Sequence, residues 1–102
     1  MSIRDRASEV SHDMTGGRVA ITYCTRCKFL LRAAWLAQEL LTTFESELSE
    51  VALRPGSGGI FEVRLDGEVI ASNENGGPMP DTGEVKRLLR DRIAPGRRVG
   101  HD

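Results

Sequence analysis

The hydrophobic pattern of the chain changes its period at Cys24-Thr25-Arg26-Cys27. Before this motif, Val19, Ile21 and Tyr23 alternate with polar or smaller residues, which is typical of a half-buried strand. After it, apolar residues recur at steps of three and four, which predicts a long amphipathic helix. Its apolar stripe is expected at Leu30, Ala34, Ala37, Leu41, Phe44 and Leu48, opposite Lys28, Arg32, Glu39 and Thr42. A strand that leads directly into a helix is the first half of a βαβ unit.

The middle of the chain predicts three further strands. A short strand is expected around Val51 and Leu53, and Pro55-Gly56-Ser57-Gly58-Gly59 then breaks the chain. Asp66-Gly67 separates two alternating runs and predicts a type I′ hairpin, because both central residues of that turn need positive φ. With a two-residue turn, the expected cross-strand pairs are Val63 with Ile70 and Arg64 with Val69.

The last helix begins at Asp81-Thr82-Gly83-Glu84, which has the spacing of a capping box. Its outer face is expected to carry Lys86, Arg87, Arg90 and Arg92. The order strand, helix, strand, strand, strand, helix predicts an α/β (α+β) fold with a four-stranded mixed sheet and both helices on one face. The first two strands should be parallel, joined by a right-handed crossover. The other face, with Ala20, Thr22, Ala52, Ile60, Val69 and Ala71, is mildly apolar, so it is either solvated or covered by a second copy in a homodimer.

Length and composition limit the chain to one small domain. It has 102 residues, of which 39% are hydrophobic and 28% charged. We expect a flexible leader at 1–17, the domain at 18–94 and a short tail at 95–102. The net charge of −1 argues against a nucleic-acid partner, and no apolar run approaches the roughly 18 residues of a membrane span. The N-terminus lacks the apolar segment of a secretory signal, so a cytoplasmic protein is expected.

The two cysteines stand where a strand is expected to pass into a helix. A thiolate is the reactive form of cysteine, and a helix N-terminus together with Arg26 would lower a thiol pKa there. The second thiol can resolve a mixed disulfide formed by the first, so Cys24 and Cys27 are the expected catalytic residues of a dithiol–disulfide exchange centre. A zinc site would need two more ligands, and the only histidines, His12 and His101, lie in the expected leader and tail. An inert buried pair is the other alternative. No metal or other cofactor is expected.

The motifs resemble those of a known family when they are taken in order. They are Tyr23-Cys24-x-x-Cys27, Gly59-Ile60-Phe61-Glu62-Val63, Asp66-Gly67, Gly76-Gly77, Pro80-Asp81, the run Arg90-Asp91-Arg92-Ile93-Ala94-Pro95, and Gly100-His101. From Arg18 onward the chain is similar to the selenoprotein W/T/H (Rdx) family, and specifically to its bacterial cysteine-containing selenoprotein W-like members. The resemblance implies a thioredoxin-like fold and a thiol-based redox role with protein partners or glutathione.

The resemblance leaves open which thiol attacks. Where the family has selenocysteine, it occupies the position of Cys27, which points to that sulfur. Thioredoxin-type chemistry instead makes Cys24 the attacking thiolate, and we prefer it because the first cysteine of such a motif is normally the exposed one. Pro55 is the candidate for the cis-proline that faces the motif in thioredoxins, in a loop shorter than that of animal members.

Four aromatic or proline side chains are candidates to support the site. Tyr23 is expected in the core, and Phe29 beside the motif, where it would limit access of solvent. Trp35 is in step with the polar stripe of the helix. It either lies half-buried across the flank of the helix or is an exposed anchor for a partner protein. Pro55 is a second candidate for contact with a partner. The predicted function is thiol–disulfide exchange with a protein or glutathione-type partner. The alternative is a non-catalytic redox-sensing module that binds its partner through Trp35 or the open sheet face.

Overall fold

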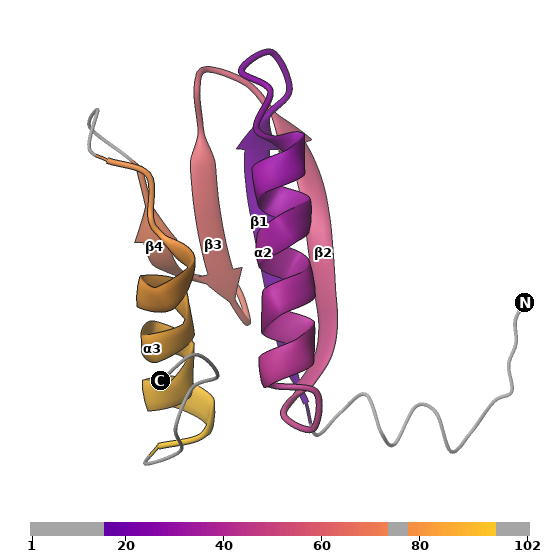
Figure 1. Ribbon diagram of the computed structural model, residues 1–102, viewed down its shortest axis with the longest axis vertical. Helices are drawn as coiled ribbons and strands as arrows, with labels where there is room; N and C mark the ends of the chain where they lie inside the picture. The colour runs from indigo at the N-terminus through magenta and orange to yellow at the C-terminus, as the bar shows by residue number, and fades with distance from the viewer. Residues whose placement is uncertain (1–15, 74–77, 96–102) are drawn as a thin grey trace, which may run out of the picture.

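The computed structural model describes residues 16–73 and 78–95. The elements are β1 (Gly17–Cys24), α2 (Leu30–Thr43), β2 (Leu48–Gly56), β3 (Phe61–Leu65), β4 (Glu68–Ser72) and α3 (Thr82–Ile93). The sheet has the order β2-β1-β3-β4, with β1 parallel to β2 and antiparallel to β3, and with β3 and β4 antiparallel. Both helices lie on one face of this sheet (Figure 1). The predicted α+β architecture is confirmed.

The ends of the predicted domain can be compared with the elements observed. Gly17, placed in the leader by the sequence, already belongs to β1, and α3 ends at Ile93. The rest of the expected leader, 1–15, and most of the expected tail, 96–102, lie outside the described residues. No helix within the described part of the chain is long and apolar enough to cross a membrane.

The buried stripe of α2 differs from the prediction. It runs through Ala33, Leu36 and Leu40, which pack with both helices and the central strands in one core. Leu30 and Leu41, expected in that core, are instead 49% and 44% exposed. The prediction was wrong here because α2 carries leucines around most of its circumference, so periodicity alone could not select the buried stripe.

The β3–β4 hairpin has the predicted two-residue turn. Both turn residues have positive φ, 51° at Asp66 and 90° at Gly67. Arg64 lies opposite Val69 as expected, but a β-bulge after Val63 shifts the next pair. Val63 therefore faces Ala71, and its predicted pairing with Ile70 is wrong.

The edge strand β2 is longer than predicted, because it continues through Pro55 to Gly56. Proline is tolerated at an edge, where its missing N–H group leaves no ladder bond unmade. The register places Pro55 opposite Tyr23 and Gly56 opposite Cys24, so the end of β2 adjoins the cysteine motif. The peptide bond before Pro55 is trans, as are all the peptide bonds described, so the proposed cis-proline is not observed.

The two helices are joined by an ion pair that the sequence pattern did not suggest. Lys86, expected on the outer face of α3, is only 3% exposed, and its Nζ donates to Glu39 Oε1 on α2 at 2.9 Å. The start of α3 is as predicted, since Asp81 Oδ1 accepts a 3.0 Å hydrogen bond from the backbone N–H of Glu84.

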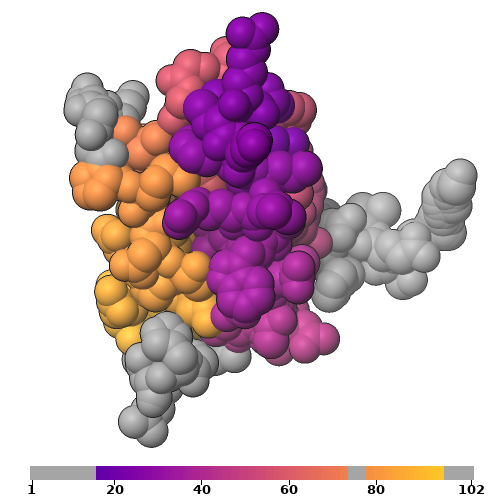
Figure 2. Space-filling model, turned by 45° about the horizontal axis from the view of Figure 1, so that its top comes forward, coloured from indigo at the N-terminus to yellow at the C-terminus, as the bar shows by residue number. Residues whose placement is uncertain are grey.

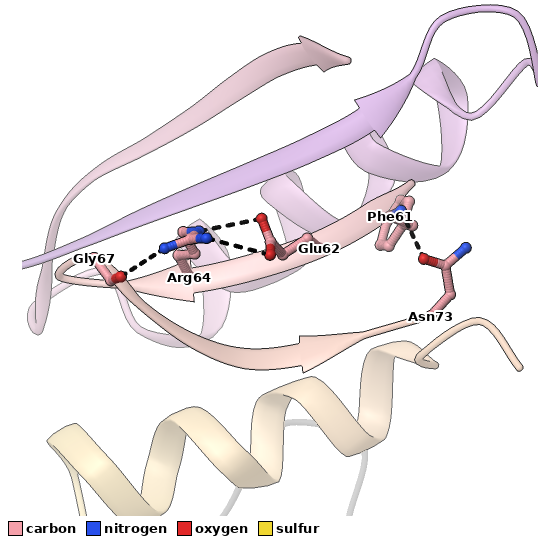
Figure 3. A network of polar contacts seen from close by, with 5 residues as sticks. All are labelled: Phe61, Glu62, Arg64, Gly67 and Asn73. Atoms are coloured by element: carbon pink, nitrogen blue, oxygen red, sulfur yellow. Dashed lines mark hydrogen bonds and ion pairs between the residues drawn. The ribbon is translucent and has the colours of Figure 1, made fainter. Parts of the chain in front are cut away.

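The sheet face opposite the helices is more charged than expected. It carries two ion pairs. Arg18 of β1 pairs with Glu50 of β2 at 3.9 Å. Arg64 pairs with Glu62, two residues before it on β3, at 3.1 Å, as Figure 3 shows. Ala20, which pairs with Ala52 of β2 and Arg64 of β3, is 8% exposed on this face. The predicted homodimer through this face stays a prediction.

Candidate active site

The cysteine motif occupies a loop between β1 and α2. Cys24 is the last residue of β1, residues 25–28 form turns, and α2 begins at Leu30 with Phe29 as its N-cap. Figure 1 places this loop beyond the strand ends, and Figure 2 shows it projecting from the surface. The helix therefore begins three residues after Cys27, later than the sequence pattern suggested.

The two sulfurs are in contact. Cys27 Sγ lies 2.7 Å from Cys24 Sγ and donates its S–H to it, and both residues are free thiols. Their access to solvent differs, because Cys24 is 2% exposed whereas Cys27 is exposed. The expectation that Cys24 would be the exposed member of the pair is therefore wrong. Cys24 is buried at the end of the central strand β1, where Gly56 of β2 lies opposite it and the Ile60 carbonyl of the β2–β3 loop accepts a hydrogen bond from its N–H.

The electrostatics of the pair separate the two pKa values. The pKa of Cys24 is lowered, first by the hydrogen bond from Cys27, against an opposing effect of burial. Backbone N–H groups of Gly59, Arg26 and Cys27 lower it further. The pKa of Cys27 is raised, because its proton is held by Cys24 and because burial and the negative charge on Cys24 oppose its ionisation. The first proton of the pair is thus lost from Cys24, and Cys27 keeps its own.

The donors to the Cys24 sulfur come from loops and not from the first turn of a helix. Arg26 acts through its backbone N–H, while its side chain is exposed. The predicted stabilisation by a helix N-terminus is therefore replaced by backbone groups of the motif itself and of Gly59. Such groups stabilise a thiolate through the same charge–dipole attraction as a helix end.

The loop after β2 supports the motif and was not identified as functional from the sequence. Its Ile60 carbonyl accepts from Cys24 N at 2.8 Å, and the carbonyl of Gly56, the last residue of β2, accepts from Thr25 N at 3.2 Å. Gly58 and Gly59 have φ of 76° and 77°, a conformation that favours glycine. The Ser57-Gly58-Gly59 sequence was the available signal, but it was interpreted only as a chain break.

Asn73 fixes this loop from the end of β4. Its Nδ2 donates to the Gly59 carbonyl at 2.7 Å, and its Oδ1 accepts from Phe61 N at 2.9 Å. Figure 3 shows Asn73 directed at the start of β3. An asparagine directly after a strand resembles an ordinary turn residue, so the sequence did not distinguish this role.

The remaining predicted site residues are divided between the motif and α2. Phe29 packs edge-on against Phe61, with ring centroids 6.0 Å apart and an interplanar angle of 80°, and Tyr23 is partly buried against the core. Pro55 is exposed at the end of β2. Trp35 is 55% exposed and lies farther along α2, on its outer face.

A metal ion has no cluster of ligands in the described part of the chain. Within 16–73 and 78–95, no three His, Cys, Asp or Glu side chains are grouped so that they could hold one. His12 and His101, the remaining ligands considered above, lie outside those ranges.

The mixed sheet, the two helices on one face and the paired thiols after the first strand define a thioredoxin-like α+β protein with a C-x-x-C motif. A model of the Rdx family matches residues 18–91, and the chain belongs to this family. This confirms the resemblance found in the sequence and indicates a redox-related role.

Two crystal structures resemble the chain along nearly their whole length. A protein from Bordetella parapertussis is 47% identical with a TM-score of 0.73, and the match covers 76% of this chain and 99% of that one. A selenoprotein W-related protein from Vibrio cholerae is 41% identical with a TM-score of 0.71, covering 74% and 95%. Among proteins with curated descriptions, none matches.

Proposed function

We propose that the chain is a thiol–disulfide oxidoreductase in which Cys27 attacks and Cys24 resolves. The observation that carries this assignment is the 2.7 Å sulfur contact between an exposed and a buried thiol. An external disulfide can reach Cys27, whereas Cys24 is covered by the fold. The lowered pKa of Cys24 makes it the proton acceptor for its neighbour. This assignment reverses the one we preferred from the sequence.

The reaction proceeds in two exchange steps. The Cys27 proton passes to the Cys24 thiolate as Cys27 Sγ attacks a disulfide R–S–S–R′, which forms a mixed disulfide with R and releases R′S⁻. Cys24 then loses that proton, attacks Cys27 Sγ and displaces RS⁻. The products are the Cys24–Cys27 disulfide and two substrate thiols that share one proton, and the substrate has gained two electrons. The partner is a protein disulfide or a glutathione-type disulfide, in the cytoplasm.

Trapping of the mixed disulfide tests this order. In Cys24→Ser, 5,5′-dithiobis(2-nitrobenzoate) should leave a stable adduct on Cys27 that mass spectrometry detects. In Cys27→Ser, adduct formation at Cys24 should be at least tenfold slower, because that sulfur is buried. Equal rates in the two variants would contradict the assigned roles. Failure of the wild-type chain to form an intramolecular disulfide under mild oxidation would contradict the function itself.

A second candidate function is a redox sensor that binds a partner without turnover. It is supported by Trp35, whose exposure exceeds half of its surface on a helix adjoining the thiols. The two functions differ in stoichiometry. An oxidoreductase supplied with a dithiol reductant reduces many disulfides per chain, whereas a sensor is oxidised once and changes its partner affinity.

A further inference from the structure

The outer side of α2 exposes large apolar side chains next to the cysteine motif. Leu31 is 83% exposed and Trp35 is 55% exposed. They are four residues apart, so they lie one above the other on the same helix face. Leu30, at 49%, is at the motif end of the helix and Leu41, at 44%, near its other end. Exposed apolar side chains of this kind on a small domain are typical of an interaction surface.

The exposed apolar residues of α2 lie on two sides of the helix. Glu39 pairs with Lys86 of α3, so the flank of α2 that carries Glu39 faces α3. At 100° per residue, Leu30 and Leu41 lie about half a turn around the helix from Glu39, whereas Trp35 and Leu31 lie only about 40° and 80° from it. Leu30 and Leu41 therefore point away from α3 and toward β2, which Figure 1 shows at the far edge of the sheet. Leu31 and Trp35 form a separate, outward-facing apolar patch near the motif.

The motif end of α2 is positively charged. Arg26, Lys28 and Arg32 are all exposed, and residues 16–38 contain no Asp or Glu. No described carboxylate forms an ion pair with any of these three cations. A ligand covering Cys27 therefore meets cations first and apolar side chains beyond them.

We propose that the α2 surface, defined as Leu30, Leu31 and Trp35 together with Arg26, Lys28 and Arg32, docks a protein partner through a segment of apolar and acidic residues. The partner is the protein whose disulfide Cys27 attacks, so the inference rests on the proposed function and specifies its substrate class. Trp and Leu on the surface supply desolvation energy to such a segment, and its carboxylates complement the cations.

Two other occupants fit this surface less well. A small thiol compound could reach Cys27 but would leave Trp35, in the second turn of α2, uncovered. A second copy docked about a two-fold axis at the motif end would bring its Arg26, Lys28 and Arg32 against the same three residues. Like charges at that distance oppose association.

Competition between three disulfides tests the proposal. Two synthetic peptides each contain one internal disulfide. In the acidic peptide the disulfide is flanked by Leu and Glu, and in the basic peptide by Leu and Lys. Hydroxyethyl disulfide serves as a small neutral substrate. The wild-type chain should reduce the acidic peptide with a kcat/KM several-fold above that of the basic peptide. In Leu31→Gln/Trp35→Gln, the ratio of kcat/KM for the acidic peptide to that for hydroxyethyl disulfide should fall about tenfold.

Matched variants separate docking from general damage. Val69→Gln changes an equally apolar side chain, 40% exposed on β4, and should leave this ratio unaltered. Arg32→Glu should abolish the preference for the acidic peptide, whereas Arg87→Glu, exposed on α3, should preserve it.

Each outcome decides a different point. Equal reduction of the two peptides by the wild-type chain, or an unchanged ratio in the double variant, would overturn the docking surface while leaving the oxidoreductase intact. A wild-type dimer in sedimentation that dissociates in the double variant would assign the surface to a second copy and also overturn the proposal. Failure to reduce any of the disulfides, hydroxyethyl disulfide included, would overturn the proposed function instead.

Discussion

Asn73 donates a 2.7 Å hydrogen bond to the carbonyl oxygen of Gly59, and the N–H of Gly59 lowers the pKa of Cys24. The side chain directly after β4 thus fixes a backbone donor of the thiol site from across the hairpin. The same amide accepts from Phe61 N, so it holds the β2–β3 loop at two points. Asn73 is therefore a positioning residue, which acts on the sulfur through Gly59.

Replacing Asn73 should raise the pKa of Cys24 toward its ordinary value. In Asn73→Ala both hydrogen bonds are lost, and we expect about 1–2 kcal/mol of destabilisation as well. In Asn73→Asp the oxygen that accepts from Phe61 is kept, while the donor to Gly59 is replaced by a repelling carboxylate oxygen. Thiolate absorbance at 240 nm as a function of pH measures the effect on Cys24. A loss of stability with no change in this titration would show that Asn73 only holds the loop.

The proton shared by the two sulfurs gives a second prediction. The hydrogen bond from Cys27 is the largest cause of the lowered pKa of Cys24, so Cys27→Ala should raise that pKa. Conversely, Cys24→Ala should lower the pKa of Cys27, because its hydrogen-bond acceptor and neighbouring negative charge are removed. The pH dependence of the alkylation of Cys27 by iodoacetamide measures the second effect. Shifts in the opposite directions would contradict the donor and acceptor roles.

The stability of the reduced protein should depend on pH in a manner set by these shifts. Cys24 has a lowered pKa in the folded state, so its contribution is fully present above the pKa of an unfolded thiol and is lost as pH falls through the folded value. Cys27 has a raised pKa, so its contribution is present below the unfolded value and is lost as pH rises through the folded one. The unfolding free energy, from urea titrations under reducing conditions, should therefore pass through a maximum near the pKa of a free thiol. The double variant Cys24→Ala/Cys27→Ala should lack this maximum, and its persistence there would assign it to other groups.

Removing one partner of the ion pair between the helices should lower the free energy of unfolding more than replacing both partners by apolar residues. Glu39→Ala leaves the ammonium of Lys86 buried without its partner, and we expect about 2 kcal/mol of destabilisation, reduced from the value for a fully buried pair because Glu39 is 30% exposed. The double change Glu39→Leu/Lys86→Met should be within about 1 kcal/mol of the wild type. Urea unfolding measures both. Equal losses in the single and double variants would show that the charge on Lys86 contributes nothing.

The sequence predicted the local structure correctly at positions where the backbone conformation or an unpaired N–H group requires one of a few residue types. Asp66-Gly67 specified the hairpin because few residues accept positive φ, and Asp81 specified the start of α3 because its carboxylate caps a free N–H. The phase of α2 was not predictable in this way. Leu30, Leu31 and Trp35 are as apolar as the core residues, and only the tertiary packing of Ala33 and Leu40 shows which side is covered.

The sequence predicted which residues form the candidate site, but not which of the two thiols is exposed. Cys24 and Cys27 were identified from their spacing, because a dithiol at a strand end has few structural uses. Their difference in exposure depends on β1 being a central strand between β2 and β3, which the element order alone did not establish. The supporting role of Asn73 depends on a contact with Gly59, fourteen residues away in the sequence, for which the residue types gave no signal.

The turn that closes the hairpin provides a test of how local and tertiary effects combine at one residue. Asp66 has a φ of 51°, its Oδ1 accepts from Arg18 N at 3.0 Å, and its own N–H donates to the Arg18 carbonyl at 2.8 Å. Asp66→Asn retains both the acceptor and the tolerance for this φ, so its unfolding free energy should stay within about 0.5 kcal/mol of the wild type. Asp66→Val should lose about 2–3 kcal/mol, because a β-branched residue at positive φ adds strain of about 1–2 kcal/mol to the lost hydrogen bond of about 1 kcal/mol. Equal stabilities of the two variants in urea would show that neither the φ nor the bond to β1 contributes at this position.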